Sequence, residues 1–360
     1  MIKKAFFIVI VFTLFGGCSN SLSLLAPYKE SVAVYGLLNQ DDPIQYIRIE
    51  RIFLGAENAY TMAQSQDSVY FKSGDLKVTL QRWKNGMQVS VDNPATSNME
   101  IVLTDTLLQA AAGVFNQNER VYKTNHKLYQ AGLNEDVQYH LVIHNNKSGK
   151  EFTAQTGLIQ AFQLLQSVSG APNVLAPNYN LNTNINIVPG NGGIKYCYYN
   201  SPVNAGVCGL TLRFFYTDYN GSFATKQSVD ISLGTNYPQQ TAGGEKQEFD
   251  FTAGTVLVNL ANLIPVNSNL TRSVDSAEFI LNAAGQALAL YNQVNMSTSL
   301  SQSHANYTNI SGGVGVFSCR NELKLRRNIH DQSCIDSISS GALTCKLRFL
   351  NYSGVLSTCH

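Results

Sequence analysis

The fold class is decided by one stretch of the chain, 76-LKVTLQRWKNGMQVSV-91. The turn Lys84-Asn85-Gly86 separates two strand-like runs. An Asn-Gly pair tolerates the positive φ angles that a tight hairpin turn demands, so it is a strong local signal of two antiparallel strands. The stretch therefore predicts a β-hairpin and makes a sheet protein the first hypothesis.

Strand patterns continue on both sides of this hairpin. The runs are SVAVYGLL (31–38), IQYIRIERIFL (44–54), QYHLVIHN (138–145) and EFTAQTGLI (151–159). Apolar residues alternate with polar ones, so Ile47 and Ile49 fall on one face while Arg48 and Glu50 face water. The last two runs predict a second hairpin with a longer loop. Short strands at this spacing are typical of an antiparallel sandwich over 31–171.

The second half of the chain is also strand-rich. Its aromatic and β-branched runs are IKYCYYN (194–200), LTLRFFYTDY (210–219), KQSVDISLG (226–234), QEFDFT (247–252) and TVLVNL (255–260). A Pro-, Asn- and Gly-rich segment precedes them, which places a boundary near Pro172. Apolar residues from Phe279 to Val294 recur at helical spacing after a possible cap at Asp275.

These patterns predict a mainly β chain with two β-sandwich-like (Ig-like) domains. We expect the N-terminal sandwich at 31–171 and a C-terminal β-rich domain at 172–360, with one packed α-helix near 276–294. After removal of a signal sequence, the remaining length exceeds the usual size of one core, in agreement with two domains.

The N-terminus has the layout of a secretory signal. MIKK is followed by an apolar run from Ala5 to Phe15 and then by Gly16, Gly17 and Cys18. The run is about half the ~20 residues that a membrane-spanning helix needs. The small residues before Cys18 resemble a bacterial lipobox, which implies a signal peptide at 1–17, acylation of Cys18, and an anchor and tether at 18–30. The alternative is an ordinary signal peptide and a soluble secreted protein.

The residue after Cys18 is Ser19. An Asp at this position would resemble an inner-membrane retention signal, so we expect the protein to be anchored in the outer membrane. The sequence leaves open whether the protein faces the periplasm or the cell surface. Charged residues make up 14% of the chain and the net charge is +1. Nucleic-acid binding needs clustered cations, so this composition excludes a nucleic-acid partner.

Six cysteines remain after Cys18. An even number in an exported chain indicates disulfides, because the periplasm is oxidising. The pair Cys197 and Cys208 is the best single prediction, since both flank the turn-rich segment NSPVNAG between two strand-like runs. The connectivity of the four C-terminal cysteines, Cys319, Cys334, Cys345 and Cys359, stays open, and some of them are candidates for free buried thiols.

Catalytic and metal-binding patterns are scarce. His140 and His144 lie four apart in a strand-like run, about 13 Å from each other at a rise of 3.3 Å per residue, so they cannot share one ion. No CxxC pair or GxSxG elbow is present. Cys334 and His330 are a formal nucleophile pair without evidence of geometry. We therefore predict no catalytic, metal-binding or cofactor-binding residue and no enzyme activity.

The segment YTNISGGVGVF, Tyr307 to Phe317, resembles the closing motif of Bacteroidetes lipoproteins of the domain of unknown function 4249 family. The runs VAVYGLLN, IQYIRIERIF and NSPVNAGVCGLTLRFFYTDY are also similar to that family, and the chain departs from it at Cys319 and in the cysteine-rich tail. The resemblance implies a surface or periplasmic lipoprotein of uncharacterised activity. It also implies a TonB-dependent transporter as a partner.

The leading functional hypothesis is a non-catalytic binding or scaffolding accessory to envelope transport. One alternative is a hydrolase of glycans or peptides, which would need a deep cleft with converging carboxylates or a Cys-His contact. Another is an adhesion module with an exposed aromatic face. Exposed aromatic rings on a sandwich can stack on sugars or grip a peptide, whereas most such rings serve core packing.

Overall fold

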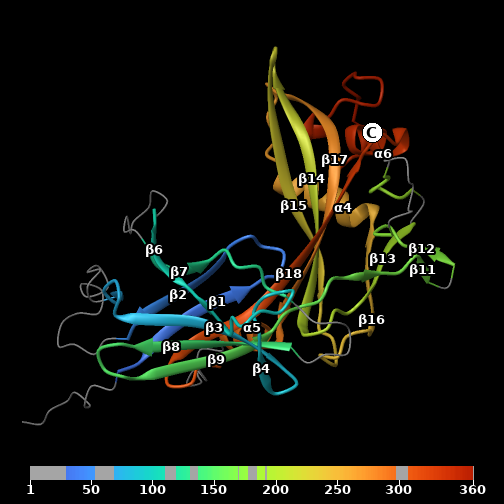
Figure 1. Cartoon of the computed structure of the whole chain (residues 1–360). Helices are drawn as coiled ribbons and strands as arrows, with labels where there is room; N and C mark the ends of the chain where they lie inside the picture. The colour runs from blue at the N-terminus through green and yellow to red at the C-terminus, as the bar shows by residue number, and fades with distance from the viewer. Residues whose placement is uncertain are drawn as a thin grey trace, which may run out of the picture.

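The computed structural model describes residues 30–52, 69–109, 119–129, 137–168, 170–176, 185–190, 193–296 and 307–359 (Figure 1). They form a mainly β, sandwich-like fold, as predicted. The strands of the first half are β1 (Val32–Leu38), β2 (Gln45–Arg51), β3 (Leu76–Lys84), β4 (Met87–Val89), β5 (Glu100–Val102), β6 (Thr104–Leu108), β7 (Glu119–Thr124), β8 (Val137–Asn145) and β9 (Glu151–Gly157).

The second half contains the longest strands and the helices. Its strands are β10 (Gln163–Leu164), β11 (Ser167–Val168), β12 (Ala171–Pro172), β13 (Ile194–Asn200), β14 (Ala205–Asn220), β15 (Phe223–Asn236), β16 (Lys246–Thr252), β17 (Thr271–Gly285) and β18 (Val314–Asn328). Its helices are α4 (Ala253–Leu263), α5 (Gln286–Met296), α6 (Gln332–Ser340) and the short 3-10 turn Cys345–Leu347. None of the helices in the described ranges has the length and apolar character needed to cross a bilayer.

Both predicted hairpins are confirmed. β3 and β4 pair through a turn in which Asn85 has φ 49° and Gly86 has φ 76°, as an Asn-Gly turn requires. β8 pairs antiparallel with β9 and also with β3. Local sequence was sufficient here because each hairpin is specified by its own turn and alternation.

One long sheet runs through the whole molecule. Its strand order is β15-β14-β17-β18-β1-β2-β7-β6, and a five-stranded sheet formed by β4, β3, β8, β9 and β5 faces its N-terminal half. A three-stranded sheet of β10, β13 and β16 faces its C-terminal half, and β11 and β12 form a separate ribbon. Figure 1 shows β14, β15 and β17 rising away from the N-terminal sheets, with β18 reaching across both regions.

Two hydrophobic cores fill the spaces between these layers. The first extends from Val32 to Leu158 and is completed by Ile310 and Phe317, which come from the far end of the chain. The second begins at Ile159 and is centred on rings such as Phe214, Phe251, Phe279 and Phe349. Residues on either side of the predicted boundary at 171 and 172 therefore meet in one sheet, through β18.

The helix prediction for 276–294 is correct only from Gln286 onward. Residues 271–285 form β17, which lies between β14 and β18. Phe279, Leu281 and Ala283, at every second position, belong to the second core, so they satisfy a strand period as well as the helical spacing. Pairing with two long neighbours outweighs the local preference, and the proposed cap Asp275 lies inside the strand.

The segment TVLVNL was predicted to be a strand and instead forms α4. Thr252 caps this helix together with Thr255, and Val256 and Leu260, four residues apart, face the core. The expectation of one helix was wrong, because α4 and α6 accompany α5 in the described chain. Asp331 caps α6 by accepting a hydrogen bond from the Cys334 amide.

Two glycines permit β18 to approach β1. A Cβ on Gly313 would lie 2.6 Å from the Val32 carbonyl oxygen, and one on Gly315, where φ is +108°, would overlap the Val34 carbonyl oxygen. Val314 to Cys319 pair in parallel with Ala33 to Leu38 at this point. Only glycine fits both the angle and the space at Gly315.

We expect Gly315→Ala to lower the free energy of unfolding by at least about 3 kcal/mol, because the new methyl group forces β18 away from β1. The matched control is Gly74→Ala, where φ is +82° but no heavy atom lies within 4 Å, and where the cost is about 1–2 kcal/mol. Urea unfolding, followed by circular dichroism and by the fluorescence of the single tryptophan, Trp83, measures both. Equal losses in the two variants would contradict the close packing at Gly315.

Candidate functional site

Residues of β1, β2, β18 and α5 line an aromatic hollow. Helix α5 packs against β18, β14 and β17 of the eight-stranded sheet. The volume of the hollow is about 430 Å³. We call it the aromatic groove, and its lining residues are Tyr35, Gly36, Leu37, Asp42, Ile44, Tyr46, Leu288, Tyr291, Val316 and Arg320.

The period of two along the strands places these side chains on the outer face. In β1, Val32, Val34 and Leu38 are buried in the first core, whereas Tyr35 lies on the opposite face of the sheet. Register then sets Tyr35 beside Val316 of β18. The alternation that builds the core therefore also builds the groove.

The groove leaves large apolar side chains in contact with solvent. Tyr35 is 37% exposed, Tyr46 is 41% exposed, and Val314, next to the groove on β18, is 40% exposed. Scattered apolar side chains are ordinary on a protein surface, but a contiguous cluster marks a contact site. Tyrosine suits such a site because its ring is apolar and its hydroxyl stays hydrated.

Charged groups surround the groove in neutralised pairs. The Arg48 guanidinium lies 5.7 Å from the centre of the Tyr35 ring, and its Nε is 2.9 Å from a Glu50 carboxylate oxygen. At the other end, Arg320 pairs with Asp42. Burial, followed by a hydrogen bond with Tyr291, raises the pKa of Tyr35, so its ring stays uncharged at physiological pH. The groove thus presents neutral aromatic surface with a polar edge.

The side chains that line the aromatic groove suit contact with another molecule. Of the described lining residues, Asp42 alone carries a carboxylate, and it is paired with Arg320. The lining contains Tyr, Leu, Ile and Val side chains and no Ser, Cys or His. Hydrolysis by general acid and base needs two positioned groups of suitable pKa.

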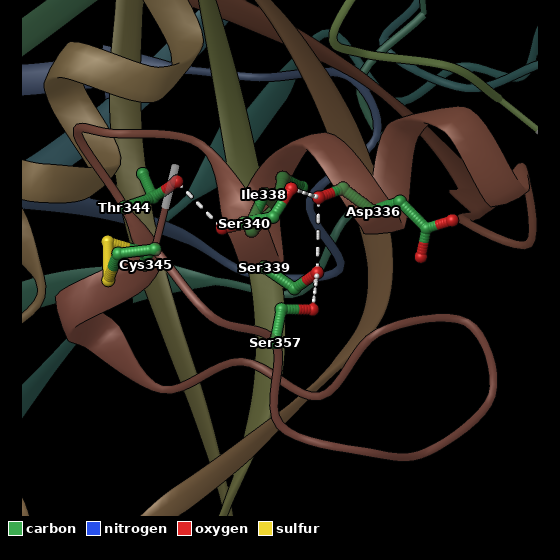
Figure 2. Close-up of a disulfide and its surroundings, with 8 residues drawn as sticks. Asp336, Ile338, Ser339, Ser340, Thr344, Cys345 and Ser357 are labelled. Atoms are coloured by element: carbon green, nitrogen blue, oxygen red, sulfur yellow. Dashed lines mark hydrogen bonds between the residues drawn. A yellow bond between two sulfur atoms is a disulfide. The ribbon is translucent and has the colours of Figure 1, made fainter.

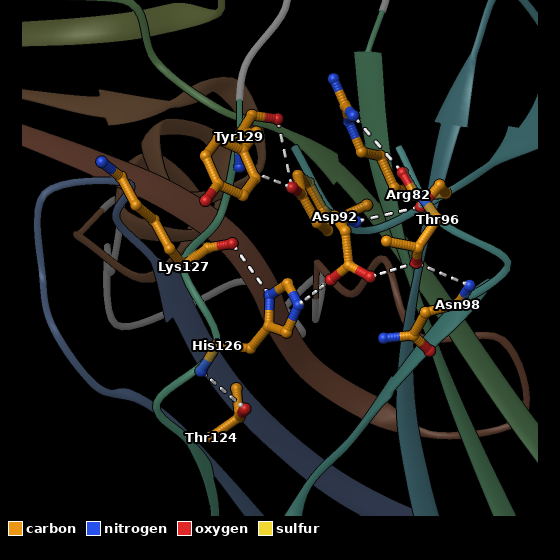
Figure 3. A network of polar contacts seen from close by, with 10 residues as sticks. Arg82, Asp92, Thr96, Asn98, Thr124, His126, Lys127 and Tyr129 are labelled. Atoms are coloured by element: carbon orange, nitrogen blue, oxygen red, sulfur yellow. Dashed lines mark hydrogen bonds and ion pairs between the residues drawn. The ribbon is translucent and has the colours of Figure 1, made fainter. Parts of the chain in front are cut away.

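A second polar cluster, centred on Asp92 and His126, holds loops together (Figure 3). Nε2 of His126 is 2.8 Å from Asp92 Oδ1, and Nδ1 is 2.9 Å from the Lys127 carbonyl oxygen. Thr96 donates a hydrogen bond to the other oxygen of Asp92. This bond, and then the contact with His126, lower the pKa of Asp92. Both ring nitrogens face oxygen atoms, so neither is left for a nucleophile as a catalytic triad requires.

The predicted histidines lie on β8, as expected. His140 stacks on Trp83 with 4.7 Å between ring centres, and burial lowers its pKa. His144 lies four residues further along the same strand, opposite Lys77 of β3 and Glu151 of β9. Within the ranges that the structure describes, no three His, Cys, Asp or Glu side chains are grouped as metal ligands.

Cys18, the signal peptide and most of the tether at 18–30 lie outside the described residues. The predicted disulfide between Cys197 and Cys208 is wrong, because both thiols are free and buried. Cys197 lies on β13 opposite Phe249, while Cys208 lies on β14 opposite Ala283, so the intervening turn carries the chain from one sheet to another.

The disulfide of the described chain joins Cys345 to Cys359, beside α6 (Figure 2). Its Cα atoms are 5.3 Å apart. Ser357 belongs to the loop that the bond closes, and its hydroxyl lies 3.1 Å from that of Ser339 on α6. The two partners were among the four C-terminal cysteines whose pairing the sequence left open.

The other two tail cysteines are buried thiols, and burial raises the pKa of Cys319 and of Cys334 to about 11. The Cys334 thiol is hydrogen-bonded to the backbone of Ile187 and Val188. His330 instead lines a separate hollow together with Arg326. The formal pair of Cys334 and His330 therefore has no arrangement for nucleophilic catalysis.

The sequence offered an exposed aromatic face only as what an adhesion module would show, and it identified none of the groove residues. Alternation along β1 and β2 was the available signal for Tyr35 and Tyr46. The contribution of Tyr291 and Val316 depends on the pairing of β18 with β1 and on the start of α5 at Gln286, which no local pattern indicates.

Comparison with known proteins adds no relative. No protein-family model matches the chain, and no curated protein matches it. The likeness of Tyr307 to Phe317 to the domain of unknown function 4249 family stays a prediction.

We expect four thiols to react with Ellman's reagent when the chain with Cys18→Ser is unfolded in concentrated guanidinium without reductant. They are the free cysteines Cys197, Cys208, Cys319 and Cys334. Prior reduction opens the Cys345–Cys359 bond and adds two, which gives six. In the folded protein the four react slowly, because burial keeps them protonated and inaccessible. A count of two before reduction would show a second disulfide among these four cysteines and contradict their free state.

Proposed function

We propose that this chain is a lipid-anchored lipoprotein of the bacterial outer membrane, and that it acts as a non-catalytic binding accessory to envelope transport. The observation that carries the binding role is the aromatic groove, with exposed Tyr35 and Tyr46 on an open sheet face. The N-terminal sequence that ends at Cys18 supports the anchor.

The groove's chemistry suits an apolar segment of a partner protein. Tyrosine and arginine are the residues enriched where protein interfaces gain most of their energy. Arg48 and Arg320 are already paired with carboxylates at the edge, so a partner need not supply a counter-charge to each of them. An uncharged, aliphatic or aromatic segment would displace water from the tyrosine rings at little electrostatic cost. We propose that the partner is a domain of a transporter in the same membrane.

We expect Tyr46→Lys to reduce partner recovery about tenfold when the tagged protein is captured from detergent-solubilised membranes, because one buried interface tyrosine contributes about 1.4 kcal/mol or more. Tyr237→Lys is the matched control, since Tyr237 is 49% exposed, lies on the loop after β15 and does not belong to the groove lining. Quantitative mass spectrometry measures the yield. Recovery of no transporter, or equal loss in both variants, would count against the accessory role of the groove.

We expect cells to incorporate labelled palmitate into the wild-type chain and not into Cys18→Ser, because the acyl chains require that thiol. Each buried methylene adds about 0.8 kcal/mol to membrane attachment, so the variant should also leave the membrane fraction. Labelling followed by fractionation measures both effects. Palmitate label that survives the substitution would contradict acylation at Cys18. The capture experiment would still test the binding role of the aromatic groove.

A further inference from the structure

A second hollow lies at the junction of the two cores, bordered by the start of α5. Its volume is about 380 Å³. We call it the junction cavity, and its hydrogen-bonding side chains include Gln138, Gln155, Asn204, Gln286, Tyr307 and Asn309. Helix α5 contributes to both hollows, since Leu288 and Tyr291 line the aromatic groove while Gln286 and Leu290 line the junction cavity.

The cavity is polar but uncharged. Amides, two threonines and a tyrosine supply its polar groups, and none of its described lining side chains belongs to Asp, Glu, Lys, Arg or His. A charged ligand would lose its hydration there without gaining a counter-charge, which is costly. The cavity therefore selects for neutral ligands.

Part of the polar set holds the walls in place. Asn204 donates to the Leu158 carbonyl oxygen at 2.9 Å. Asn309 makes two hydrogen bonds to the backbone of Phe317, at 2.7 and 2.9 Å. Gly157 allows the contact with Asn204, since a Cβ there would lie 2.5 Å from Asn204 Nδ2. These bonds fix the walls before any ligand arrives, which reduces the ordering cost of binding.

The rest of the polar set is open to a ligand. Gln155, Gln286 and Thr241 are exposed, and their side chains make no hydrogen bond to another described residue. An amide offers a donor and an acceptor at one place, which matches a hydroxyl group that also does both. Leu290 and the Tyr307 ring supply apolar surface in the same cavity. Neutral hydroxyl groups together with an apolar face describe a sugar ring.

We propose that the junction cavity binds a neutral carbohydrate of one or two sugar rings, with Gln155 and Gln286 donating to and accepting from its hydroxyls. The volume lies near the small end of the range of about 300–1,000 Å³ for ligand pockets, which sets the ligand size. A neutral peptide is less well matched, because its backbone groups need a row of partners in register. The proposal goes beyond the binding role of the aromatic groove and depends neither on that groove nor on the anchor.

The test is calorimetric titration of the mature chain carrying Cys18→Ser. The neutral probes are glucose, galactose, N-acetylglucosamine and their β-1,4-linked disaccharides. The charged probe is glucuronic acid, and the peptide probe is blocked tri-asparagine. We expect at least one neutral sugar to bind with a dissociation constant of about 1 mM or tighter, and glucuronic acid to bind at least about tenfold more weakly than that sugar.

The double variant Gln155→Ala and Gln286→Ala should weaken sugar binding about tenfold or more, because it removes two exposed amides without touching either core. Gln163→Ala is the matched control, an exposed glutamine on β10 outside the cavity lining, and should leave the affinity unchanged. Tyr46→Ala should also leave it unchanged, which separates this site from the aromatic groove. Urea unfolding verifies that each variant is folded.

Three results would overturn the proposal. The first is no heat of binding with any neutral sugar at about 10 mM. The second is binding that the double glutamine variant leaves intact. The third is tighter binding of the blocked peptide than of every sugar, which would assign the cavity to a peptide.

Discussion

The parallel pairing of β18 with β1 is the constraint on which the rest of the structure depends. Val314 to Cys319 lie against Ala33 to Leu38, and the strand then continues antiparallel along β17. Without this strand the first core would lack Phe317, and the long sheet would separate into two pieces. Gly313 and Gly315 make the approach possible, since any side chain there would meet the carbonyl groups of β1. Both hollows depend on the same junction, because Val316 lines one and Cys319 the other.

A buried arginine organises the far end of the second core. Arg272, at the start of β17, is 1% exposed; its Nε donates to Asp218 at 2.8 Å, and its other nitrogens donate to the Leu347 and Pro265 carbonyl oxygens. Isolated charges are not tolerated in a core, so each of its donors needs a partner. The arginine thereby joins β14, the loop after α4 and the C-terminal tail. The Cys345–Cys359 bond closes a second attachment within that tail. The two attachments together explain how a segment with little regular structure covers the core around Phe349.

Sequence predicted what short-range chemistry specifies and missed what distant pairing specifies. The Asn85-Gly86 hairpin and the β8–β9 hairpin followed from turns and alternation, and both are present. Residues 271–285 have apolar spacing that fits a helix and a strand alike, and the neighbouring strands decide between them. The sequence could predict only part of the aromatic groove. Alternation along two strands near the N-terminus indicates that Tyr35 and Tyr46 lie on the outer face, whereas Tyr291 belongs to a helix far along the chain. The prediction of a Cys197–Cys208 disulfide failed for the same reason. The two cysteines lie close in sequence, on either side of NSPVNAG, but they belong to different sheets.

The position of β18 also has a consequence for biosynthesis. Ala33 meets Val314, so almost the entire polypeptide has to leave the ribosome before the first sandwich can close. Contacts between such distant residues form slowly, because a very long loop is closed for each of them. During translation the nascent chain therefore carries an open β1 edge and an incomplete sheet, and unpaired strand edges of this kind are prone to pair with other chains until β18 has been made.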